Sequence, residues 1–179
     1  MNLMIFNKIN TYIKNNDGLT FIEGALILPM LLTLLFGLYD IGQAIIINQK
    51  VTSAAHIAAD LVTRKLTVDN GDMLDAYGAA RLVIDPYDRA PLGMDIVGIQ
   101  FDDDDDPEEK WRYTNNMTQT ASLPSSADGL GVSGEGVVAV SVVYPYTPYF
   151  SGGVVGSFDM QEISYLRGRK NSYVRWVEE

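Results

Sequence analysis

The sequence predicts an α+β protein in which a long N-terminal transmembrane helix continues into a helix packed on an antiparallel β-sheet. Three observations lead to this prediction: an apolar run at residues 19–39, a helical periodicity through residues 49–65, and a periodicity of two from residue 94 onward. We therefore divide the 179 residues into a short N-terminal segment (1–18), an N-terminal helix (19–66) and an α+β domain (67–179).

The apolar run from Leu19 to Tyr39 has 21 residues and a single charge, Glu23. A helix of that length is roughly 30 Å long, about the hydrocarbon thickness of a bilayer. Membrane helices tolerate an internal proline such as Pro29 better than soluble helices do, and the charge of Asp40 marks the far boundary. A buried core helix would usually be shorter and more amphipathic, so we predict a single membrane span at residues 19–39.

The distribution of basic residues predicts the orientation of this span. Lys8 and Lys14 precede it, whereas the first base after it is Lys50. The positive-inside rule then favours a cytoplasmic N-terminus and an exported C-terminal body. The apolar run is too long for a typical removable signal peptide, and no small-x-small cleavage site follows it closely.

The charge of the chain excludes several functions. The formal net charge is -10, and residues 60–179 account for all of it, with twenty acids against ten bases. Because an acidic body repels phosphate backbones, we expect no nucleic-acid binding. The chain has no cysteine and one histidine, His56, and its glycine-rich stretches match no nucleotide-binding motif, so we expect neither an enzyme nor a cofactor.

Glu23 has two interpretations. As a boundary residue it would only face lipid headgroups. If the chain were cut after Gly18, however, Leu19 would carry a new α-amine, and Leu19 and Glu23 are spaced i, i+4 on one face of a helix. The carboxylate would then become half of an ion pair with an amine of the same chain or of a neighbouring one.

A polar leader that ends in glycine, an apolar helix and a glutamate at the fifth mature position resemble the processing site of type IV prepilins. The stretch "FIEGALILPMLLTLLFGLYDIGQAI" is similar to the N-terminal signature of TadE-like pseudopilins of the tight-adherence (Tad/Flp, type IVc) pilus system. The resemblance implies that a prepilin peptidase cuts between Gly18 and Leu19, and that Glu23 serves subunit assembly. One departure is that Leu19 replaces the aromatic residue with which many mature pilins begin, and Phe21 follows two positions later.

The same resemblance implies a pilin-like fold and the function of a minor pilin-like subunit, used in assembly or priming of the pilus. The chain would be a single-pass protein of the bacterial inner membrane, with a periplasmic body that is able to enter an extracellular pilus. The implied partners are a prepilin peptidase, a major pilin, other minor pseudopilins and an inner-membrane assembly platform. The alternative is a permanently anchored periplasmic binding module that keeps residues 1–18 and never enters a filament.

Small residues recur along the N-terminal helix at a spacing that allows close helix approach. The pairs are Thr33/Gly37 in the membrane half and Ala54/Ala58 above it. They would serve either packing on the chain's own sheet or contact with another subunit, and the sequence leaves both open. We expect His56, within the same helix, to have a structural role.

The remaining elements follow in order. Asp69 or Asn70 is expected to cap a second helix over residues 71–84, which Asp85 and Pro86 end. Strands are expected at residues 94–102, 110–114 and 136–146, with the last at 159–169 or 171–177. Short connections suggest an antiparallel meander with the long helix across one face.

Two stretches carry unusual composition. The run "FDDDDDPEEK" offers Asp102, Asp104 and Asp106 as candidate calcium ligands, but it lacks the spaced ligand pattern, so a solvated hairpin loop is the favoured interpretation. The stretch "YPYTPYFSGG" at residues 144–153 is expected to leave the sheet and cover one end of the core. Exposed aromatic side chains there would make it a partner contact instead.

Overall fold

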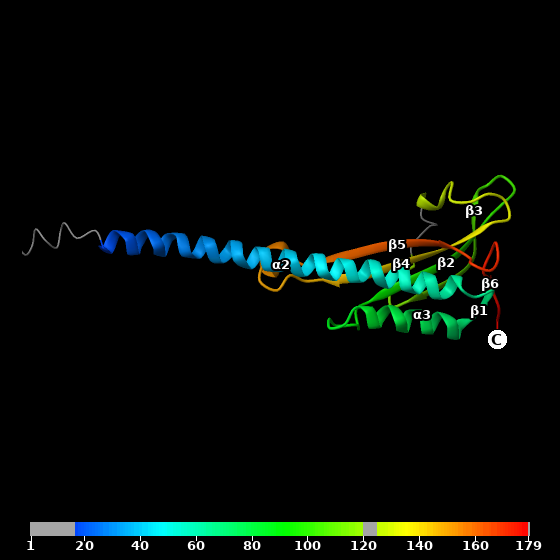
Figure 1. Cartoon of the computed structure of the whole chain (residues 1–179), viewed down its shortest axis with the longest axis horizontal. Coiled ribbons are helices and arrows are strands. Elements are labelled where there is room, and N and C mark those ends of the chain that lie inside the picture. Colours follow the sequence, from blue (N-terminus) through cyan, green and yellow to red (C-terminus); the bar gives the residue numbers. More distant parts are fainter. Residues whose placement is uncertain (1–16, 120–124, 179) are drawn as a thin grey trace, which may run out of the picture.

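The computed structural model describes residues 17–119 and 125–178, in which one long helix, α2, projects from a small α+β body (Figure 1). Helix α2 runs from Asp17 to Thr63 without interruption. Residues 1–16, most of the expected leader, lie outside the described residues. The α+β layout predicted from the sequence is confirmed.

Up to Leu35, the first half of α2 is not covered by any other described part of the chain. Residues from Phe21 to Phe36 are all exposed, and the apolar window that qualifies as a membrane span is 0% buried. Pro29 lies inside the helix, where the Thr33 hydroxyl donates to its carbonyl oxygen at 2.9 Å. The helix is therefore long and apolar enough to cross a membrane, and its exposed apolar surface indicates a membrane anchor.

The second helix of the body, α3 (Asn70–Val83), begins with the expected cap. The Asp69 side chain accepts a hydrogen bond from the Asp72 backbone N–H at 2.8 Å, and the Asp72 side chain accepts one from the Asp69 N–H. This reciprocal capping box satisfies two N–H groups that would otherwise lack partners at the helix start. The helix ends at Ile84, directly before the Asp85–Pro86 bond.

Four antiparallel strands form the main sheet in the order β3-β2-β4-β5. Their bounds are Gly93–Phe101 for β2, Pro107–Asn115 for β3, Gly136–Tyr146 for β4 and Phe158–Arg167 for β5. The expected meander is therefore wrong: β4 pairs with β2, from Gly93↔Val143 to Gln100↔Gly136, and not with β3. The physical reason is polarity, since β2 is buried along almost its whole length, whereas β3 starts with exposed charged residues and takes the edge.

The C-terminal segment is divided between two sheets. Of the two alternatives for the last strand, residues 158–167 join the main sheet. Residues Arg175–Trp176 form a short strand, β6, which pairs in parallel with β1 (Thr67–Val68) just after α2. This small pair holds the chain end against the start of α3.

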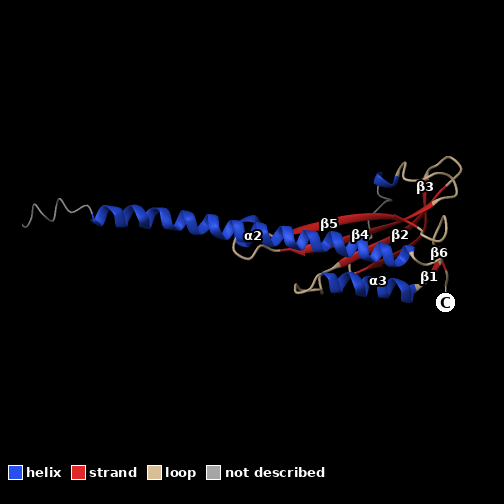
Figure 2. Cartoon of the chain, viewed as in Figure 1, coloured by secondary structure: helices blue, strands red, loops and turns tan. Residues whose placement is uncertain are grey.

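The core lies between the two helices and one face of the main sheet (Figure 2). The second half of α2 contributes small residues that are fully buried, namely Ala54, Ala55, Ala58 and Ala59, together with Val51. Small side chains let the helix approach the sheet closely. On the opposite face of the sheet, Val97, Ile99, Ala127 and Ala139 form a second, smaller cluster.

Candidate functional site

The expected cleavage and assembly residues lie at the start of the bare helix. Since α2 begins at Asp17, the peptide bond between Gly18 and Leu19 lies in its first turn. Gly18 and Glu23 are both exposed, and no hydrogen bond to the Glu23 carboxylate is formed within the described part of the chain. A Cβ atom placed on Gly18 would meet nothing within 4 Å, so packing in this chain does not require glycine there.

The small-residue pairs differ in their surroundings. Thr33 is exposed and Gly37 half-buried, with nothing within 4 Å of a Cβ placed on Gly37. Ala54 and Ala58 are 0% exposed and belong to the core of the body. The Ala54/Ala58 pair therefore packs within this chain, and Thr33/Gly37 is the pair that remains open to a neighbour.

A third group of residues, which sequence reasoning missed, joins α2 to the body at Asp40. The Asp40 side chain is 4% exposed although it directly follows the apolar run. Its carboxylate accepts hydrogen bonds from the backbone N–H groups of Tyr149 at 3.0 Å, Phe150 at 3.1 Å and Ser151 at 2.6 Å. The Ser151 hydroxyl donates to it at 2.8 Å. Four donors thus surround one buried carboxylate, which is how a buried charge is stabilised without a salt bridge.

The backbone of Asp40 takes part in the same contact. The Tyr146 hydroxyl donates to the Asp40 carbonyl oxygen at 3.0 Å. Burial raises the pKa of the Tyr146 hydroxyl above its ordinary value, with a further contribution from the Asp40 charge. The hydroxyl therefore remains a protonated donor at neutral pH, and β4 is tied to α2 where the sheet ends.

Aromatic rings extend this contact toward the bare half of the helix. The Phe150 ring stacks on Phe36 with centroids 4.4 Å apart, and it meets the edge of Tyr39 at 5.5 Å. Tyr149, beside it, is 86% exposed. The expectation that residues 144–153 leave the sheet is wrong for Tyr144 to Tyr146, which stay in β4 and pair with β5. Beyond Tyr146 the chain leaves the sheet, and Phe150 packs against α2.

A pocket of about 360 Å³ lies next to this contact, between α2, the loop before β2 and the end of β4. Its polar groups are paired: the Tyr87 hydroxyl donates to the Gln43 side chain at 2.8 Å, and the Tyr144 hydroxyl donates to the Asp88 carbonyl at 3.0 Å. Burial raises the pKa of Tyr144, so this hydroxyl also stays protonated. We find here a set of structural contacts and no pair of groups arranged for acid–base chemistry.

The aspartate run forms the hairpin loop between β2 and β3. The Asp102 carboxylate accepts the N–H groups of Asp104 and Asp106, both at 2.9 Å, so it faces its own loop. Asp105 accepts the Ser133 N–H at 2.6 Å from the neighbouring loop. Within residues 17–119 and 125–178, no group of three or more acidic or histidine side chains is placed to hold a metal ion.

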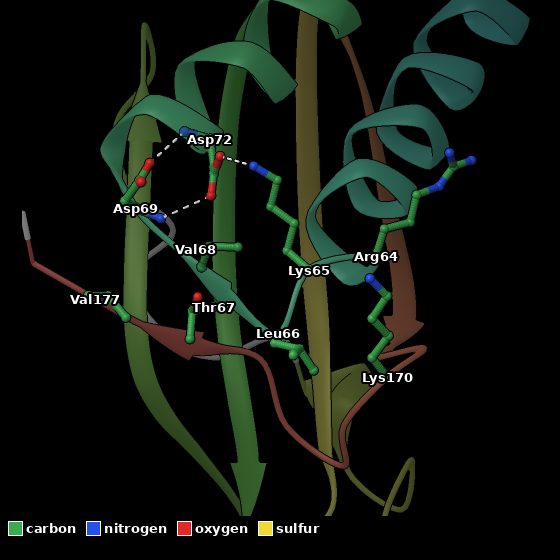
Figure 3. Close-up of a pocket in the computed structure, with 9 residues that line it drawn as sticks. All are labelled: Arg64, Lys65, Leu66, Thr67, Val68, Asp69, Asp72, Lys170 and Val177. Carbon is green, nitrogen blue, oxygen red and sulfur yellow. Dashed lines mark hydrogen bonds and ion pairs between the residues drawn. The ribbon is translucent and has the colours of Figure 1, made fainter.

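A second pocket, of about 520 Å³, lies at the end of the body where α2 finishes (Figure 3). Lys65 points to Asp72 and forms an ion pair with it, while Asp72 also completes the capping box of α3. Arg64 pairs with Asp60 one turn earlier. Lys170 lines the same pocket. His56 is structural in its contact: its Nδ1 lies 2.8 Å from the Ser164 hydroxyl and links α2 to β5.

The architecture defines a class: an α+β protein in which one long N-terminal helix, apolar enough in its first half to cross a membrane, continues into the body and packs on its sheet. Comparison with known families narrows this class, since residues 18–60 match the model described as TadE-like protein. The resemblance expected from the sequence is thus confirmed over the N-terminal helix, and it is consistent with a TadE-like protein of the Tad pilus system. No curated protein and no solved structure matches the chain.

Proposed function

We propose that the protein is a minor pilin-like subunit, made as a precursor, cut by a prepilin peptidase between Gly18 and Leu19, and used in assembly or priming of a tight-adherence type IV pilus. The observation that carries this proposal is the position of Glu23. It is an exposed acid on an apolar helix that no described residue around it covers, within the segment that matches the TadE-like model from residue 18.

The bare helix requires a covering that the chain does not supply. In the membrane this covering is lipid, and in a filament it would be the helices of neighbouring subunits. Thr33 is exposed, and a Cβ atom placed on Gly37 would meet nothing within 4 Å, which suits close helix approach. The buried Ala54/Ala58 pair lies in the C-terminal half of the same helix, where it packs in the core of the body.

Cleavage would change the electrostatics of the anchor. A lone carboxylate at the centre of a bilayer costs roughly 2.5–3.5 kcal/mol on insertion scales, and less near an end. Removal of residues 1–18 would place an α-amine on Leu19, one helical turn from Glu23. The pair would neutralise the carboxylate, and an amine on one subunit would be able to meet Glu23 of the next.

Gly18 supports this interpretation from a different direction. A side chain at position 18 would meet no atom of the described chain within 4 Å, so packing does not account for the glycine. A requirement imposed by a peptidase active site would explain the glycine.

The body would then lie in the periplasm, and the partners would be the peptidase, a major pilin, other minor pseudopilins and the inner-membrane assembly platform.

The first test is the N-terminus of the mature protein, read by intact mass with and without a co-expressed prepilin peptidase. A start at Leu19 that depends on the peptidase supports the proposal. The variant Gly18→Val should block cleavage, whereas Gly24→Val, at a second helical glycine with equally open surroundings, should not. A chain that still begins at Met1 beside an active cognate peptidase would instead favour the permanently anchored binding module.

A further inference from the structure

The loop between β4 and β5 exposes apolar side chains that nothing else in the described chain covers. It contains the short helix α4 (Gly152–Val155), where Val154 is 92% exposed and Val155 63% exposed. Tyr149 before the helix and Phe158 after it are exposed as well. We refer to residues 147–157 as the β4–β5 loop.

Contacts with Phe36 and Asp40 hold the loop at one position along α2. Asp40 accepts three of its backbone N–H groups, and Phe150 stacks on Phe36 at 4.4 Å. Phe36 precedes Asp40 by one helical turn, roughly 6 Å along the axis toward the N-terminus. The loop therefore contacts the apolar segment of α2 itself, and Figure 1 shows it (orange) at the end of the body from which the bare helix projects.

The charge of this surface differs from that of the rest of the body. Residues 136–158 contain no Asp, Glu, Lys or Arg, in a chain whose net charge is -10. An acidic surface would be repelled by anionic headgroups, while an uncharged one with Tyr and Phe suits the region between headgroups and hydrocarbon. The chemistry of the loop thus fits the interface of a bilayer.

From these observations we propose that the β4–β5 loop is a second membrane contact, which inserts Tyr149, Val154 and Val155 into the lipid–water interface beside α2. The occupant of the exposed surface is lipid, because the loop is uncharged and its Phe150 stacks on Phe36 within the apolar segment of α2. The contact would fix the tilt and height of the body on the membrane. It rests on the anchoring of α2 and is independent of cleavage and filament assembly.

The absence of cysteine makes a direct test available. A single cysteine introduced by Val154→Cys is labelled with an environment-sensitive fluorophore, and the full chain is placed in nanodiscs at one copy per disc. The matched control is Val132→Cys, also exposed (54%), in the loop that precedes β4 and therefore at the other end of that strand. Both positions lie on the surface, so neither variant disturbs the core, and circular dichroism verifies the fold.

We expect the label at position 154 to shift its emission to shorter wavelength and to be quenched by lipids that carry a shallow quencher, while the label at 132 behaves as in water. Emission like that in water at both positions would overturn the proposal. A shift at 154 that appears only when several copies share a disc would also overturn it, and would assign the loop to a contact between subunits. Neither result depends on a peptidase, so failure here is distinct from failure of the proposed function.

Discussion

The carboxylate of Asp40 joins segments that lie 109 to 111 residues apart in the sequence. Sequence analysis placed Asp40 correctly as the end of the apolar run but treated it only as a boundary charge. Nothing in the local pattern identifies its donors, because these are backbone N–H groups and carry no side-chain signature. The turn-rich composition of residues 147–153 was the available signal, since such turns leave N–H groups without partners in the sheet.

We therefore predict that Asp40→Asn loosens the β4–β5 loop without unfolding the body. The amide of asparagine has the shape of the carboxylate, but its NH₂ group is itself a donor. It cannot accept the backbone N–H groups that the carboxylate binds. Amide hydrogen exchange at Tyr149, Phe150 and Ser151 should accelerate by at least about tenfold, equivalent to a loss of about 1.4 kcal/mol of local stability. Asp159→Asn, at an exposed acid just after the same loop, is the control and should leave these amides unchanged. Equal exchange in both variants would show that Asp40 does not hold the loop.

At the scale of helices and strands, the residue bounds of each element were easier to predict than the order of the strands in the sheet. The bounds of β4 follow from a run of β-branched residues between glycine and a proline–aromatic stretch, and the structure confirms 136–146. The order of strands depends on which strand is buried on both sides, which is a property of the whole sheet. The charged residues of "PEEKWRYTN" are typical of an edge strand. This polarity predicts β3 at the edge of the sheet, beside β2, and excludes the meander.

The hairpin of β2 and β3 also contains a close contact between two residues that the sequence pattern does not predict. Trp111 lies over Gly98, its register partner, and its indole N–H donates to the Val174 carbonyl at 2.8 Å. A Cβ atom on Gly98 would come within 2.1 Å of the Trp111 ring. The glycine thus admits the ring that ties the edge of the sheet to the C-terminal segment.

From this geometry we predict that Gly98→Ala destabilises the body by about 1–3 kcal/mol, the usual cost of overpacking. Trp111 would have to move, losing its hydrogen bond and its contact with Trp176, whose ring centroid is 5.8 Å away. Urea unfolding of the full chain in detergent micelles measures the free energy, and the fluorescence of the two tryptophans reports the displacement. Gly153→Ala, at a glycine with open surroundings, serves as the control and should change neither quantity. An unchanged midpoint for Gly98→Ala would mean that the ring is accommodated elsewhere.

On the scale of the whole molecule, the protein is arranged in three zones along α2. The bare helix is apolar with one acid, the junction at Asp40 is uncharged on its outer surface, and the body beyond it is acidic. The sequence predicted the first and third zones from hydropathy and charge alone. The junction depends on tertiary contacts between α2 and the β4–β5 loop, so only the structure reveals that the body meets the anchor through Phe36, Tyr39 and Asp40.

This separation of zones allows the role of Glu23 to be tested without disturbing the body. Glu23→Gln keeps the size of the side chain and removes its charge, and position 23 has no contact with the body because the helix around it is exposed. Membrane insertion and the thermal unfolding of the body should both be unchanged, since uncharging a residue in the span does not oppose insertion. Incorporation into pili, measured by immunoblot of sheared filaments, should fall at least about tenfold if an ion pair worth about 1.4 kcal/mol or more is lost.

The matched control is Glu23→Asp, which retains the charge and should keep most of the incorporation. Loss in both variants would show that the shape of the glutamate matters more than its charge. Normal pili with Glu23→Gln would leave Glu23 as a boundary residue that faces headgroups. In that case the bare helix would serve only as an anchor, and the permanently anchored module would become the better account of the molecule.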